Sequence, residues 1–115
     1  MSELPAGTAV DAAALPLAHA PLPASDVVSG APTAATIALG EVRGVEVGVW
    51  EMTPGTACDT EADEVFVVLS GRARIAFLDP ALPTIEVGPG SLVRLAEGMR
   101  TEWTVTETLR KIYVA

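Results

Sequence analysis

The chain has 115 residues, of which half are hydrophobic and 19% are charged, so it is long enough for one globular domain and too apolar for a disordered chain. Its net charge of -8 argues against nucleic acid or an anionic membrane surface as a partner, because both require clustered Lys and Arg. No apolar run approaches the roughly 20 residues of a membrane-spanning helix.

The use of cysteine and basic residues bears on the compartment. Cys58 is the single cysteine, so no internal disulfide can form and a reducing compartment is allowed. The first forty residues contain no Lys or Arg, so no positively charged export leader is expected. The expected location is the cytoplasm.

Residues 1–35 are predicted to form an Ala- and Pro-rich N-terminal arm. Five prolines in this segment disfavour a long helix or a central strand: Pro5, Pro16, Pro21, Pro23 and Pro32. The Leu and Val side chains of the arm need cover, so we expect it to run extended along the domain or across a partner subunit. His19 lies in this arm and is interpreted as a solvent-facing or packing residue rather than a ligand.

Residues 36–115 are predicted to form one all-β domain. Residues 45–52 alternate between two faces, and residues 64–69 are apolar on both faces, which suits a buried strand. SGR at 70–72 predicts a turn, and shorter strands are expected at 72–77, 84–87, 92–95, 101–107 and 109–115. Seven or eight short strands with no convincing helix predict a sandwich or a barrel.

Two turn motifs define a resemblance. Glu64 is followed seven positions later by Gly71, and a VGPGS turn at 87–91 leads into a strand that AEG at 96–98 closes. This spacing resembles the two motifs of the cupins. The segments GVWEMTPGT, DEVFVVLSGRARI and VGPGSLVRLAEGMRTEWTVTETLRKIYV, within residues 42–114, resemble the ureidoglycine aminohydrolase-like cupin domains more narrowly. The resemblance implies a jelly-roll barrel (a double-stranded β-helix), often dimeric, with a pocket in its mouth.

The metal ligands of the family are mostly missing from this chain. Cupins of this type often hold a divalent ion through paired histidines, a glutamate and a later histidine. This chain has ACDT at 57–60 where the pair stands, and Thr101 at the later position, so only Glu64 remains. Cys58 and Glu64 are weak candidate ligands, because alternating strand side chains cannot supply three donors on one face. No cofactor is expected, and a divalent metal stays open as an alternative.

Four residues are candidates for ligand binding: Trp50, Glu64, Arg100 and Trp103. The two tryptophans would form an aromatic wall or fill the core. Arg100 would bind a carboxylate or lie in solvent. Glu64 would accept a ligand or transfer a proton as the candidate catalytic residue, or it would pair with a barrel arginine.

The sequence therefore favours a homodimeric cupin that binds a small polar or carboxylate metabolite without the usual histidine metal site. Two alternatives remain: a metal-dependent enzyme resembling (S)-ureidoglycine aminohydrolase, and a structural or interaction module with a filled cavity. Whether the chain is an enzyme is left open at this point.

Overall fold

A computed structural model of the chain describes residues 4–115, and all regular structure in this range is strand. Nine strands follow in order: β1 (Ala20–Pro21), β2 (Val27–Ser29), β3 (Thr33–Val42), β4 (Val45–Met52), β5 (Gly55–Thr60), β6 (Glu64–Asp79), β7 (Ala81–Val87), β8 (Leu92–Leu95) and β9 (Arg100–Val114). Within the described range, no helix is long and apolar enough to cross a membrane.

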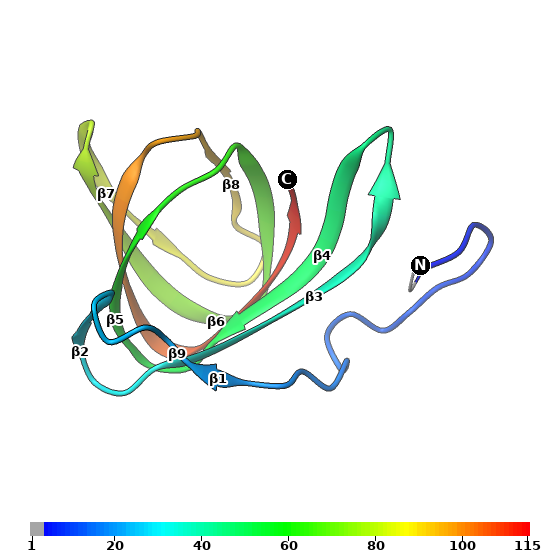
Figure 1. Ribbon diagram of the computed structural model, residues 1–115, viewed down its shortest axis with the longest axis horizontal. Helices are drawn as coiled ribbons and strands as arrows, with labels where there is room; N and C mark the ends of the chain where they lie inside the picture. The colour runs from blue at the N-terminus through cyan, green and yellow to red at the C-terminus, as the bar shows by residue number, and fades with distance from the viewer. Residues whose placement is uncertain (1–3) are drawn as a thin grey trace.

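The strands form one antiparallel sheet that curls into a barrel (Figure 1). One path through the sheet runs β1-β3-β4-β9-β5-β2, and β6 pairs with β7, β8 and β9. The first part of β9 pairs with β5 and its last part with β4, while β6 lies along its other edge. The predicted all-β barrel is therefore confirmed, and β9 is the strand that connects its walls.

Strand β6 corrects one sequence prediction. SGR at 70–72 does not form a turn, because β6 runs without a break from Glu64 to Asp79. The register against β9 shifts at Ser70 and again at Arg72, so the strand bends through bulges. Gly71 has a φ of +90°, and a Cβ there would collide with the carbonyl of Thr108. The expected segments at 101–107 and 109–115 are likewise parts of one long strand, β9.

The hydrophobic core lies inside the barrel, and most of its side chains come from alternate positions of β6, β8 and β9. Phe66 and Ile75 of β6, Leu95 of β8 and Leu109 of β9 are almost completely buried. Each contributes roughly 1.5–3 kcal/mol relative to an exposed side chain. The same alternation places the remaining inward positions of β4 and β9 around a cavity.

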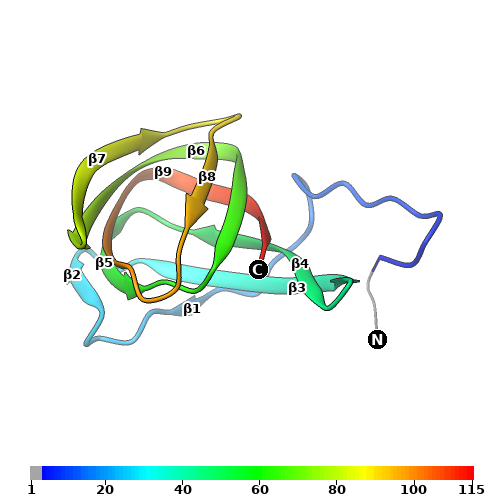
Figure 2. The ribbon, with the colours of Figure 1, turned by 90° about the horizontal axis from the view of Figure 1, so that it is seen from above.

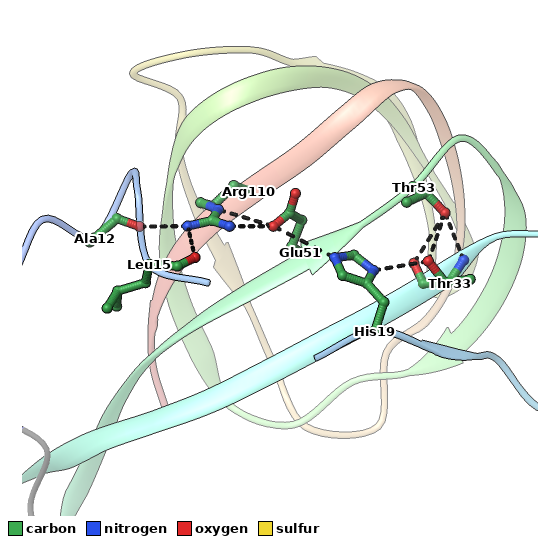
Figure 3. A network of polar contacts seen from close by, with 7 residues as sticks. All are labelled: Ala12, Leu15, His19, Thr33, Glu51, Thr53 and Arg110. Carbon is green, nitrogen blue, oxygen red and sulfur yellow. Dashed lines mark hydrogen bonds and ion pairs between the residues drawn. The ribbon is translucent and has the colours of Figure 1, made fainter. Parts of the chain in front are cut away.

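The N-terminal arm lies along the outside of its own barrel. Arg110 of β9 donates hydrogen bonds to the carbonyls of Ala12 (3.0 Å) and Leu15 (2.8 Å), and it pairs with Glu51 of β4 (Figure 3). The arm also supplies β1, which pairs with β3, and β2, which pairs with β5. Its first described residues project beyond the barrel beside β3 and β4 (Figure 2).

His19 belongs to the same polar network on the outside of the barrel. Its Nδ1 lies 2.9 Å from Oγ1 of Thr33, and its Nε2 lies 3.7 Å from Oε2 of Glu51. Thr33 in turn contacts Thr53 (Figure 3). The histidine therefore helps to attach the arm and does not reach the cavity.

Candidate functional site

Among the described residues, the barrel contains a cavity of about 360 Å³. Strands β3, β4, β5, β6 and β9 contribute to its wall, together with residues of the arm and of the loop after β5. Its lining consists of Leu22, Asp26, Thr36, Glu46, Trp50, Met52, Ala57, Cys58, Asp59, Glu61, Glu64, Trp103, Lys111, Tyr113 and Ala115.

A buried ion pair lies in the wall of the cavity. Nζ of Lys111 is 2.6 Å from Oε2 of Glu64, and the two side chains are only 7% and 13% exposed. The ammonium group also lies over three aromatic rings, 4.2 Å from the centroid of Phe66, 4.7 Å from Trp50 and 4.9 Å from Trp103. Cation–π attraction and the carboxylate together hold the charge in a largely desolvated place.

Glu61 forms a second buried cluster. Its Oε2 accepts hydrogen bonds from Oγ1 of Thr101 (2.6 Å) and from Nε1 of Trp103 (3.0 Å). Glu61 is 6% exposed and Thr101 is fully buried. The acceptors Glu61 and Thr101 fix the indole N–H of Trp103. The indole also packs against Trp50 and Phe66, with ring centroids 5.6 Å apart in each pair.

Tyr113 and Glu46 form a third polar pair at the cavity. The phenol of Tyr113 donates a hydrogen bond of 2.5 Å to Oε2 of Glu46. Burial, and then the carboxylate of Glu46, raise the pKa of Tyr113 above its usual range, so the phenol stays protonated as a donor. Gly48 lies opposite Tyr113 across the β4–β9 pairing, and any Cβ at Gly48 would collide with the tyrosine ring.

The carboxyl group of Asp59, on β5, has a raised pKa. Partial burial, followed by repulsion from Glu61 and Asp26, raises its pKa to about 6, although the backbone N–H of Thr60 and the ammonium of Lys111 oppose the shift. Asp59 therefore changes its charge close to neutral pH.

The structure brings together three of the four predicted ligand-binding residues. Trp50, Glu64 and Trp103 all line the cavity, whereas Arg100 is exposed at the start of β9 and does not line it. Cys58 reaches the lining, but its Sγ is directed to Glu102, 3.9 Å from Oε2. The side-chain partner of Glu64 is Lys111 and not one of the arginines of the barrel.

The residues present do not fit a divalent metal ion. Within residues 4–115, no group of three or more His, Cys, Asp and Glu side chains is arranged to hold one. The ammonium of Lys111 lies where a cation would contact Glu64, and His19 is engaged outside the barrel. A resident Mn, Fe or Zn ion would lack the ligand set that such ions require.

A curled antiparallel barrel with a ligand-sized interior cavity is the architecture of the cupin jelly rolls. The family model of the EutQ-like cupin domain matches residues 39–113. The chain therefore belongs to the EutQ-like cupin domain family, and the predicted resemblance to the cupins is confirmed.

Solved structures agree with this assignment. A protein of unknown function from Pseudomonas syringae, of the DUF861 family, matches 93% of the chain with a TM-score of 0.75 and 28% identity. The chain spans only 46% of that protein's length. The EutQ protein of Clostridium difficile matches 92% of this chain and 83% of its own, with a TM-score of 0.69 and 19% identity. A cupin superfamily protein from Desulfitobacterium hafniense matches 99% and 94%, with a TM-score of 0.67 and 14% identity.

These last two likenesses show the fold alone. No curated protein matches the chain.

Proposed function

We propose that the chain binds a small polar metabolite inside its barrel. The observation that carries this proposal is the cavity of about 360 Å³, whose lining combines Trp50 and Trp103 with the buried Glu64–Lys111 pair. Small-molecule sites in proteins typically have volumes of about 300–1,000 Å³ and combine apolar walls with a few placed polar groups.

The polar groups of the lining offer both kinds of hydrogen bond. An ammonium group carries three N–H donors, and among the described residues Lys111 uses one of them, on Glu64. Lys111 could thus donate to a carbonyl, hydroxyl or carboxylate oxygen of a ligand. Glu46 and Glu61 could accept from N–H or O–H groups, and Trp50 offers an apolar wall.

Saturation-transfer NMR with a set of small polar metabolites tests this proposal. The set should include amino acids, amides, ureas and short hydroxy acids, and we expect at least one of them to bind. Thr36→Trp is the matched control, because Thr36 is an exposed residue of the lining and a bulky ring there would obstruct the cavity. Binding of unchanged affinity in this variant, or no binding by any member of the set, would contradict the proposal.

A metal-dependent enzyme resembling (S)-ureidoglycine aminohydrolase is the alternative. The sequence segments within residues 42–114 and the retained Glu64 support it. Two observations argue against this enzyme. No group of three metal-ligating side chains is found among the described residues, and Lys111 already neutralises Glu64. Elemental analysis of protein purified without chelator separates the two, since about one bound transition-metal ion per chain would favour the enzyme.

We further propose that the chain forms a homodimer through the outer face of β6, β8 and β9. Val65 and Val114 are register neighbours on this face, 37% and 42% exposed, and Leu92 of β8 is 73% exposed. Exposed aliphatic side chains gathered on a sheet favour association. Sedimentation velocity should show a dimer for the wild type and a monomer for Leu92→Glu; a monomeric wild type would contradict this proposal.

The cytoplasmic location remains a prediction from the sequence.

A further inference from the structure

We propose that the ligand carries a positively charged amino group, and that this group lies at the end of the cavity formed by Asp59 and Glu61. The inference rests on the proposed function, which requires only a small polar ligand. It adds the charge of that ligand and the place where the charge is held.

The lining of the cavity contains more acidic than basic side chains. Five acidic residues line the cavity: Asp26, Glu46, Asp59, Glu61 and Glu64. Lys111 is the only basic residue of this lining within residues 4–115, and its ammonium is already paired with Glu64. The ion pairs found among these residues include none to Asp26, Asp59 or Glu61. The cavity therefore has an excess of negative charge that the protein does not balance itself.

Two of these acidic residues, Asp59 and Glu61, lie near each other. Asp59 of β5 lies directly opposite Thr101 of β9, and Thr101 donates to Glu61, so the two acidic side chains meet around the same threonine. Both donors to Glu61 bind Oε2, and no hydrogen bond to Oε1 is found among the described residues. Since no fully buried side-chain oxygen in this range lacks a partner, Oε1 is accessible to solvent, and Glu61 is a residue of the cavity lining.

The charged form of Asp59 is unfavourable in the free protein, and a ligand ammonium would stabilise it. Partial burial, and after it repulsion from Glu61 and Asp26, disfavours the charged form of Asp59 and raises its pKa to about 6. A ligand ammonium would replace this repulsion by charge-assisted hydrogen bonds to Asp59 and to Oε1 of Glu61. The rings of Trp50 and Trp103 already stabilise one ammonium, that of Lys111. A ligand that carries only a negative charge would instead face the four acidic lining residues that Lys111 does not pair with: Asp26, Glu46, Asp59 and Glu61.

Three probes of the same length and different charge test the inference: butylammonium, 1-butanol and butanoate. Each is titrated into the full chain at pH 7.5, and the indole N–H signals of Trp50 and Trp103 are followed by NMR. We expect butylammonium to bind at least tenfold more tightly than 1-butanol, and butanoate not to bind. The affinity for butylammonium should fall as the pH is lowered from 7.5 to 5, because Asp59 then takes up a proton.

The other ionisable groups that line the cavity with Asp59 are Glu61 after β5, Asp26 before β2, Lys111 on β9, Glu64 on β6 and Glu46 on β4. Variants identify the group responsible for the pH dependence. Asp59→Asn should weaken butylammonium binding at least tenfold, abolish its pH dependence near 6 and leave 1-butanol unchanged. Glu61→Gln should weaken butylammonium binding in the same direction. Glu107→Gln, an exposed acid of β9 outside the lining, should change nothing.

The outcomes separate the two proposals. If 1-butanol or butanoate binds as well as butylammonium, or if Asp59→Asn has no effect, the amine inference is overturned and the binding function stands. It is also overturned if none of the three probes binds while another metabolite does. If neither these probes nor any metabolite binds, the proposed function itself fails.

Discussion

Glu64→Gln is expected to lower the free energy of unfolding by about 3 kcal/mol, because it takes from the buried ammonium of Lys111 the one carboxylate that pairs with it directly. The pair is close, at 2.6 Å, and both side chains are at most 13% exposed. Water can therefore replace the lost carboxylate only in part. Urea unfolding of the two proteins at pH 7 gives the difference directly.

A double variant separates the ion pair from the loss of one side chain. Glu64→Gln combined with Lys111→Met removes both charges and places an unbranched apolar chain beside the three rings, so most of the stability should return. Glu86→Gln is the matched control, because its pair with Arg74 is 78% and 62% exposed and should contribute less than about 1 kcal/mol. Equal losses in the single and double variants would show that the charge of Lys111 is not the cause.

Arg110→Met should lower the free energy of unfolding by about 3 kcal/mol and loosen the N-terminal arm. The guanidinium group is 10% exposed, pairs with Glu51 and donates to the carbonyls of Ala12 and Leu15. Without it, Glu51 keeps among residues 4–115 only the ion-pair contact with His19, and the two carbonyls lose this donor (Figure 3).

Hydrogen exchange followed by mass spectrometry measures the second effect. Amides of residues 8–22 should exchange faster in Arg110→Met than in the wild type, while amides of β6 keep their relative order of protection. Arg94→Met removes an arginine that is 60% exposed and should leave the exchange of the arm unchanged. Unchanged protection of the arm in Arg110→Met would mean that β1 and β2 hold it without the arginine.

The fold could be predicted from local patterns because most strands carry their own signal. The alternation over 45–52 matches β4 with its inward Trp50 and outward Val49. The continuity of β6 could not be predicted, since Ser70 and Gly71 have the same local chemistry in a turn and in a bulge. Only the pairing with β9, far along the chain, decides between them.

The candidate site was predictable only in part, because its pairs join distant residues. Glu64 and Lys111 are 47 positions apart, and nothing local indicates that they meet. Arg100 could have been set aside from the sequence, since Thr101 and Trp103 face inward and a strand alternates its side chains. The same alternation in the RKIY segment would have placed Lys111 and Tyr113 together inside.

Consecutive residues of β9 serve opposite sides of the barrel wall. Arg110 anchors the arm outside, and Lys111 places its ammonium inside. A shift in the register of this strand by a single position would exchange the two cations. The arm would then lose the hydrogen bonds of Arg110, and a guanidinium group would lie between the three aromatic rings that now surround the ammonium of Lys111. Any redesign of the chain that lengthens or shortens the preceding loop must therefore preserve this parity.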